Sequence, residues 1–308
     1  QNCRLRMQAV YQFLRCGYAT EARRIMREVL TSLNISYPTS GRHALLLLLW
    51  RKIRLMFRGM KFVLRDKSCI PMEQQLRLDA YRSASALSSI DLIQGYEFGY
   101  RHLIEALEAG DAGQIAFGLP VEIAGLSTNG PANSKKVEKL ISIARELAER
   151  EADPYLLSRV EFAESVVYNL RGRFRLSNQK LEICDQLLRD KCTGVATEKA
   201  TNRQMMAGNL LFLGELRKIS AQMVHLEDAV ERGDLYEETN IRTLYAPFHY
   251  LSHDKPDLAR REIDIAFERW PTEQFDIQHW QGVYARAFID LYEQKGGSGY
   301  AYFLSVEP

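Results

Sequence analysis

The sequence lacks the features on which several large classes of protein depend. Its five cysteines are odd in number and form no CxxC pair, so we expect free thiols in a reducing compartment and a cytoplasmic protein. The run Ala44–Trp50 holds seven apolar residues, far fewer than the roughly 20 that cross a bilayer. The net charge is only +2, which gives no argument for nucleic acid. We therefore expect neither a membrane span nor a nucleic-acid partner.

Signatures of nucleotide binding and catalysis are missing as well. A phosphate-binding loop needs GxxxxGK[ST], or GxGxxG after a strand, whereas the glycine-rich stretch 296–299 has neither the lysine nor a strand before it, and we interpret it as a linker. There is no GxSxG, HRD or DFG. We expect a chain that is not an enzyme and that uses no cofactor.

No segment alternates apolar and polar residues with a period of two, so the chain is expected to be almost wholly helical. Residues 153–190 form the clearest pattern. Asp153 and Pro154 are typical of a helix start, and the apolar residues that follow at three- and four-residue spacing predict one helix up to Leu170. Gly172 interrupts this pattern, and a second apolar stripe follows. We expect a helical hairpin in which Leu170 faces Leu187.

This hairpin recurs along the chain. Gly130, Gly172 and Gly214 are 42 residues apart, and acidic starts precede the units at Asp111, Asp153 and Asp234. A period near 40 with two helices per unit is typical of an α-solenoid. We predict an all-α, TPR-like α-solenoid of about six or seven hairpins, with the three glycines in the turns within hairpins.

The predicted organisation is one solenoid over residues 1–308. It begins with a hairpin in 1–41 that turns at Gly17, where Leu14, Gly17, Tyr18 and Ala22 are similar to a tetratricopeptide unit. A basic amphipathic helix is inserted at 42–66, repeat hairpins occupy 67–295, and a truncated further helix starts in 296–308. Because the helical pattern is cut at both ends, we expect the chain to continue in a longer polypeptide. The expected helix pairs are 73–90 with 91–109, 112–128 with 132–150, 154–171 with 174–190, 196–213 with 215–232, and 235–252 with 255–269, followed by 275–294.

Residues 42–65 depart from the repeat, because no acid occurs between Val29 and Arg65. On one helix, five cations at spacings of three and four would form a single stripe, and Leu46, Leu49, Ile53, Met56, Met60 and Leu64 would form the opposite one. Three interpretations are open: a helix that buries its apolar stripe and leaves a solvated basic edge, an interfacial membrane helix, or a basic docking surface. Acids of another hairpin, such as those in 97–111, are the internal alternative for covering the cations. The predicted partner-binding residues are Arg51, Arg54, Arg58, Lys61 and Arg65.

A metal site is the alternative function. His249 and His253 are four residues apart and would share a helix face, with Asp254 and Asp257 close by. This pair lacks the glutamate of HExxH, and Pro247 is expected to kink the helix. Two partly exposed histidines near a helix end explain the same pattern without a metal. A metal-dependent enzyme, or binding of nucleic acid or a membrane surface through 42–65, therefore stands beside the main hypothesis.

Several stretches resemble a known family: GRHALLLLLWRKIRLMFRGMKFVLRD (41–66), ALSSIDLIQGYEFGYRHLIEALEAGD (86–111), CTGVATE (192–198), GDLYEETNIR (233–242) and DIQHW (276–280). They look like the TPR-like C-terminal region of large bacterial serine/threonine kinases that also carry an ATPase module. The resemblance implies a non-catalytic interaction or regulatory region of a signalling protein. Its partner would be another protein, or the kinase or ATPase part of the same polypeptide.

Overall fold

The computed structural model describes residues 2–271 and 275–305, and throughout these residues the secondary structure is helical, with no strand. The class prediction of an all-α protein is confirmed. The first helices are α1 (Asn2–Arg15), α2 (Ala19–Ser32) and α3 (Gly41–Arg58), followed by α4 (Met72–Ala84) and α5 (Leu92–Ala109). The paired helices of the repeat region are α6 (Ala112–Ser127) with α7 (Ser134–Arg150) and α8 (Pro154–Leu170) with α9 (Phe174–Lys191).

The remaining helices are shorter and more often interrupted. They are α10 (Ala196–Phe212), α11 (Leu216–Ala221), α12 (Val224–Glu231), α13 (Leu235–Asn240), α14 (Ala246–Leu251), α15 (Pro256–Arg269), α16 (Ile277–Tyr292) and α17 (Gly296–Ser305). Contacts divide the chain into two compact units: unit 1 holds residues 1–11 and 22–195, and unit 2 holds residues 12–21 and 196–308. That the whole chain forms one solenoid stays a prediction.

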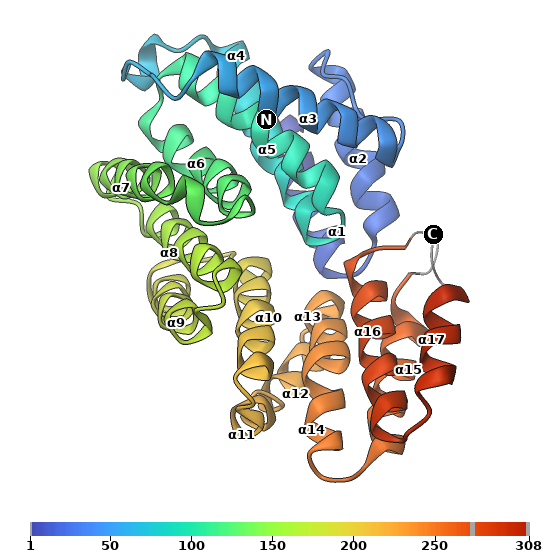
Figure 1. Ribbon diagram of the computed structural model, residues 1–308. Helices are drawn as coiled ribbons and strands as arrows, with labels where there is room; N and C mark the ends of the chain where they lie inside the picture. Colours follow the sequence, from blue (N-terminus) through green and yellow to red (C-terminus); the bar gives the residue numbers. More distant parts are fainter. Residues whose placement is uncertain (1, 272–274, 306–308) are drawn as a thin grey trace. The chain divides into compact units, whose positions relative to one another are not determined.

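Unit 1 has a continuous apolar core built between consecutive helices. α5 contacts α3, α4 and α6, while α8 contacts α6, α7 and α9 (Figure 1). The core runs through these helices from Leu55 and Leu78 to Leu147 and Val167. Each helix pair therefore buries its apolar stripe against its neighbours in sequence, as expected for stacked hairpins.

The turn glycines lie where the 42-residue spacing places them. Gly130 lies between α6 and α7, Gly172 between α8 and α9, and Gly214 between α10 and α11. Their φ angles of 74°, 69° and 68° fall in the left-handed region that a side chain disfavours. This prediction is confirmed.

The acidic helix starts are also as expected. The carboxylates of Asp111 and Asp153 accept hydrogen bonds from the backbone N–H groups of Gln114 and Tyr155, at 2.8 Å in both cases, and Asp234 accepts from Glu237 in the same way. Each carboxylate thereby satisfies an N–H group that has no partner within the helix. The recurring acids therefore fix where hairpins begin.

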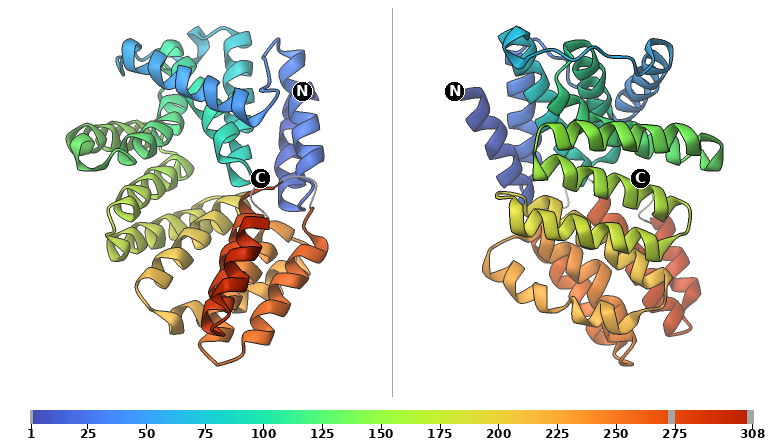
Figure 2. Two further views of the ribbon diagram at one scale, coloured as in Figure 1. Left: turned by 45° about the vertical axis from the view of Figure 1, so that its right-hand side comes forward. Right: turned by 90° about the vertical axis from the view of Figure 1, so that its left-hand side faces the viewer.

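Unit 2 contains a break at the expected proline. α13 runs into a π-helical turn, η4 (Ile241–Tyr245), and α14 then begins with Pro247 in its first turn. Proline has no N–H to donate, and the wider π turn accommodates the missing bond. α14, α15, α16 and α17 follow as successive packed helices (Figure 2). The stretch 296–299, interpreted above as a linker, instead starts α17, so that interpretation is wrong.

The end of α8 and the first turn of α5 differ in how closely they pack. Leu170 is 48% exposed at the end of α8, so it does not face Leu187 across a core, and Val167 is the buried residue at that end. Gly95, in the first turn of α5, meets backbone directly: a Cβ there would lie 2.3 Å from the Ser88 nitrogen.

Candidate functional site

The surface of α3 is the most unusual feature of unit 1. Seven apolar side chains of this helix are between 43% and 82% exposed, with Phe57 the most exposed. Their spacing of three and four residues gathers them on one side of the helix. We call this surface the α3 face; it consists of Leu45, Leu46, Leu49, Trp50, Ile53, Met56 and Phe57.

The opposite side of α3 is the one that packs. Ala44 and Leu55 are buried, and Leu48 packs against the core that α5 forms. The interpretation that the stripe through Leu46 and Ile53 is buried is therefore wrong for the helix itself. A monomeric protein rarely leaves so many neighbouring apolar side chains in water without a use for them.

Arg51 lies on the packed side of α3, where a buried carboxylate neutralises it. Its Nε atom is 3.6 Å from Glu97 Oε1, and Glu97 is completely buried in α5. Arg101 donates to the same oxygen at 2.6 Å and also to the Ser36 carbonyl oxygen. Burial, and then the nearby Arg101 charge, lower the pKa of Arg51, while Glu97 opposes both. Arg51 is thus part of an internal ion network.

Arg54 and Arg58 also pair with a carboxylate of α5. The Arg54 Nη2 atom donates to Glu108 of α5 at 3.1 Å, and Arg58 approaches the same carboxylate at 4.0 Å. Arg58 also donates to the carbonyl oxygens of Gly59 and Lys61, beyond the helix end. Acids of 97–111 therefore pair with these three arginines, which is the internal alternative considered from sequence, and the Arg54 side chain stays 43% exposed.

Lys61 and Arg65 do not share a helix with the other three cations. α3 ends at Arg58 because Gly59, with φ of 73°, takes a conformation that a helix cannot continue. The chain then runs without regular structure past α5, where the Arg65 N–H donates to the Gly110 carbonyl oxygen at 2.9 Å. The expected helix over 42–65 is therefore seven residues too long, and both side chains are exposed.

Three exposed cations flank α3 along the chain. Arg42 is exposed at its N-terminal end, and Lys61 and Arg65 are exposed beyond its C-terminal end. Within the described part of the chain, none of the three has a carboxylate within 4.0 Å. The α3 face is thus an apolar surface, with exposed cations shortly before and after it in the chain.

The histidine pair does not form a metal site in the described residues. The rings of His249 and His253 are 4.7 Å apart, but His249 Nδ1 bonds Ser220 Oγ at 2.8 Å and His253 Nδ1 bonds the His249 carbonyl oxygen at 2.8 Å. Asp254 accepts from the Tyr292 hydroxyl. Partial burial, with the nearby His253 second, lowers the pKa of His249. No group of three potential ligands occurs in residues 2–271 and 275–305.

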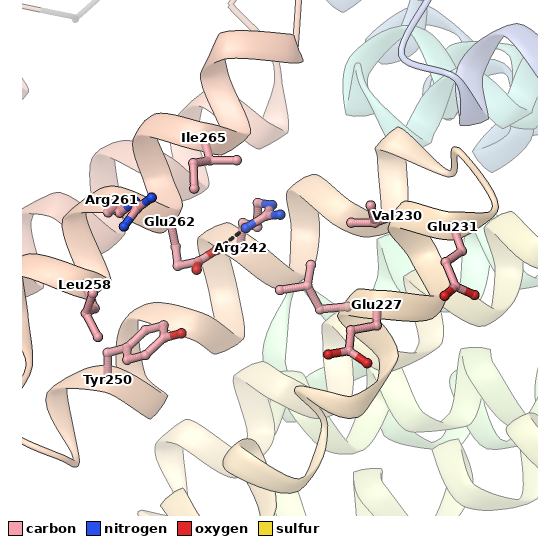
Figure 3. A pocket seen from close by; sticks show the side chains of 10 residues that line it. Glu227, Val230, Glu231, Arg242, Tyr250, Leu258, Arg261, Glu262 and Ile265 are labelled. Carbon is pink, nitrogen blue, oxygen red and sulfur yellow. Dashed lines mark hydrogen bonds and ion pairs between the residues drawn. The ribbon is translucent and has the colours of Figure 1, made fainter.

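Unit 2 carries a groove of about 580 Å³ between α12 and α15 (Figure 3). Leu226, Val230 and Ile265 provide apolar walls, and Glu227 and Arg261 lie at its sides. The Arg242–Glu262 ion pair also lines the groove, and Arg242 donates to Glu238 at 3.0 Å. The Arg242 charge is therefore balanced by carboxylates of the same unit.

Comparison with known proteins adds no assignment: no family model, no curated protein and no solved structure matches the chain. In the described ranges, no helix combines the length and the apolar character that a bilayer crossing needs. The α3 face was missed from sequence because residues 42–65 contain two opposed stripes. On the side that packs inward, Arg51 lies 3.6 Å from Glu97, and Ala44 and Leu55 are buried.

Proposed function

We propose that this chain is a non-catalytic, TPR-like helical-repeat region that binds a protein partner through the α3 face. The observation that carries the proposal is the exposure of seven apolar side chains on one side of α3 while the arginines of the other side are paired with α5. The repeat of turn glycines every 42 residues supports a TPR-like solenoid as the scaffold.

The partner that fits is an amphipathic helix with an apolar face and acidic residues near its ends. Apolar side chains spaced by three and four residues are the usual match for such a helix in helix-to-helix recognition. Acidic residues at its ends would meet Arg42 at one end of the α3 face and Lys61 and Arg65 at the other. A second copy of this chain is a poor match, because it would bring the same positive charges together.

A lipid surface fits less well than a protein. An interfacial helix uses the cations of its polar side to hold anionic headgroups. In α3 the cations of that side, Arg51, Arg54 and Arg58, are instead bound to Glu97 and Glu108. A protein partner is therefore the proposed occupant, and a membrane surface is an outcome of the test.

We further propose that the chain belongs to a cytoplasmic bacterial signalling polypeptide. The stretches that resemble the repeat region of kinases with an ATPase module support this proposal. In that setting the acidic helix lies either in another protein or in the kinase or ATPase part of the same polypeptide. Occupation of the α3 face would then restrain the attached module.

The proposal is tested by selecting helical peptides from a random library on the immobilised chain. The matched variants are Ile53→Ser, which removes an apolar side chain from the α3 face, and Val224→Ser, which removes a comparably exposed one from unit 2. Selected peptides are expected to carry apolar residues at helical spacing with acidic ends. They should bind Ile53→Ser at least about tenfold more weakly, and Val224→Ser unchanged, because losing a fully buried aliphatic contact costs more than about 1.4 kcal/mol.

Three other results would contradict the proposal. Binding of the wild-type chain to phosphatidylserine vesicles, lost in Ile53→Ser, would assign the α3 face to a membrane surface. A dimer in sedimentation that dissociates in Ile53→Ser would assign it to a second copy of the chain. Peptides whose affinity is the same for both variants would also reject it.

A further inference from the structure

The groove between α12 and α15 in unit 2 is lined by two helix surfaces (Figure 3). On α15 the lining residues Leu258, Arg261 and Ile265 follow one another at spacings of three and four, so they lie on one side of that helix. On α12 the lining residues Leu226 and Val230 are four apart and share one side in the same way. Each helix therefore presents a row of largely apolar side chains to the groove.

The form of the groove fits a third helix better than other ligands. Val230 of α12 and Leu258 of α15 are 41% and 37% exposed, so the groove is open to solvent. Sites for small molecules are mostly enclosed and bring a few unpaired polar groups together, whereas the lining residue Arg242 is already bound to Glu238 and Glu262. The described residues contain no strand to which an extended segment could add. Rows of side chains at helical spacing accept the ridges of another helix.

The charged residues on the two sides of the groove differ in sign. Glu227 and Glu231 each follow an apolar lining residue of α12 by one position, so they form an acidic row beside the apolar one. Arg261 lines the groove from α15 (Figure 3). All three residues are exposed, and within the described ranges none of them has an oppositely charged side chain within 4.0 Å. Negative charge is thus available on the α12 side and positive charge on the α15 side.

We propose that this groove docks an amphipathic helix of a protein partner, with basic residues on one flank of its apolar stripe and an acidic residue on the other. The apolar stripe packs between α12 and α15. Two basic residues four positions apart pair with Glu227 and Glu231, and the acid pairs with Arg261. Such edge charges select and orient a partner helix, although each exposed pair adds little affinity. The groove shares no residue with the α3 face, so this proposal is independent of the proposed function.

The apolar part of the proposal is tested with a labelled, designed peptide of about 18 residues, long enough to form a helix in water. It carries a leucine stripe, lysines on one flank and glutamates on the other, and fluorescence anisotropy with the full chain should show one saturable site. The matched variants are Val230→Ser in the groove and Val224→Ser, the same change at an exposed position of α12 outside it. Val230→Ser should weaken binding at least about fivefold, and Val224→Ser less than twofold, because only the first loses a buried apolar contact.

A second peptide, with glutamates on both flanks, tests the charges. The wild-type chain should bind it at least about threefold more weakly than the first peptide, since its acids meet Glu227 and Glu231. The double variant Glu227→Lys/Glu231→Lys should reverse this preference. Glu182→Lys/Glu268→Lys makes the same change in net charge at two exposed sites outside the groove and should keep the wild-type preference.

The proposal is overturned if the first peptide shows no saturable binding, if both peptides bind the wild type equally, or if Val224→Ser acts as strongly as Val230→Ser. Binding that is lost in Ile53→Ser and kept in Val230→Ser would place the peptide on the α3 face, which rejects the groove and leaves the proposed function standing. A dimer in sedimentation that dissociates in Val230→Ser would assign the groove to a second copy of the chain. Circular dichroism verifies that each variant is folded. If Val230→Ser unfolds, the reversal of preference in Glu227→Lys/Glu231→Lys decides the result.

Discussion

His102 is the residue whose chemistry depends most on its place in the fold. It is fully buried, and its pKa is lowered to about 3 because the charged ring would lose its hydration. The unfolded chain binds a proton on this side chain near pH 6.5, whereas the folded chain does not. The folded state is therefore favoured at higher pH, and its stability falls as the pH drops from about 6.5 toward 3.

The free energy of unfolding of unit 1 should show this pH dependence. The wild type is expected to lose about 1.4 kcal/mol for each pH unit below 6.5 through His102 alone. His102→Gln lacks the titrating group. Between pH 6.5 and 4.5, the free energy of unfolding of the wild type should therefore fall by about 2–3 kcal/mol relative to that of His102→Gln. Urea unfolding at both pH values measures it. A difference that stays constant would contradict the burial of a neutral imidazole.

Glycine offers a paired experiment on backbone packing. A Cβ at Gly95 would lie 2.3 Å from the Ser88 backbone, whereas one at Gly208, inside α10, would meet no atom within 4 Å. Gly95→Ala should thus be destabilising by more than about 2 kcal/mol, as expected for steric overpacking, while Gly208→Ala should stabilise α10 by about 0.5–1 kcal/mol through helix propensity. Thermal unfolding of both variants checks this. Equal effects would show that the α5 contact relaxes freely.

At the scale of elements, substitutions on the two sides of α3 should change the free energy of unfolding of the isolated chain by different amounts. Leu55→Ala removes a buried side chain and should lower the free energy of unfolding by about 2–5 kcal/mol. Phe57→Ala removes the most exposed one and should change it by less than about 0.5 kcal/mol. Urea unfolding of both variants tests the pair. A large loss in Phe57→Ala would show that another part of the chain covers the α3 face.

α3 also marks what the sequence could and could not predict. Turn glycines and helix-capping acids are local signals, so the turns at Gly130, Gly172 and Gly214 were placed correctly from sequence, whereas the helix expected over 215–232 is split into α11 and α12. The inward side of α3 packs against α5, where Glu97, 46 residues after Arg51, comes close to it only in the folded chain. Two opposed stripes have the same period, and periodicity alone cannot tell which one is buried.

At the scale of the whole molecule, each unit has its own buried residues. This determines which helices lose stability when one buried residue is replaced. In stacked hairpins each helix pair is stabilised by its immediate neighbours, so a cavity weakens nearby pairs most. Val167 is buried in the α8–α9 pair of unit 1, and Ile263 is buried in α15 of unit 2. Replacing either one should therefore act mainly on its own unit.

Hydrogen exchange measures this directly. Val167→Ala is expected to speed exchange across 154–191 and in the contacting helices α6 and α7, and to leave α15 and α16 protected. Ile263→Ala should do the reverse, since each substitution removes packing worth roughly 1–4 kcal/mol from a different core. Leu170→Ala is the internal control, because its exposed side chain should change exchange little. If Val167→Ala and Ile263→Ala speed exchange equally in both units, the chain unfolds as one cooperative body, and the independence of the two cores is wrong.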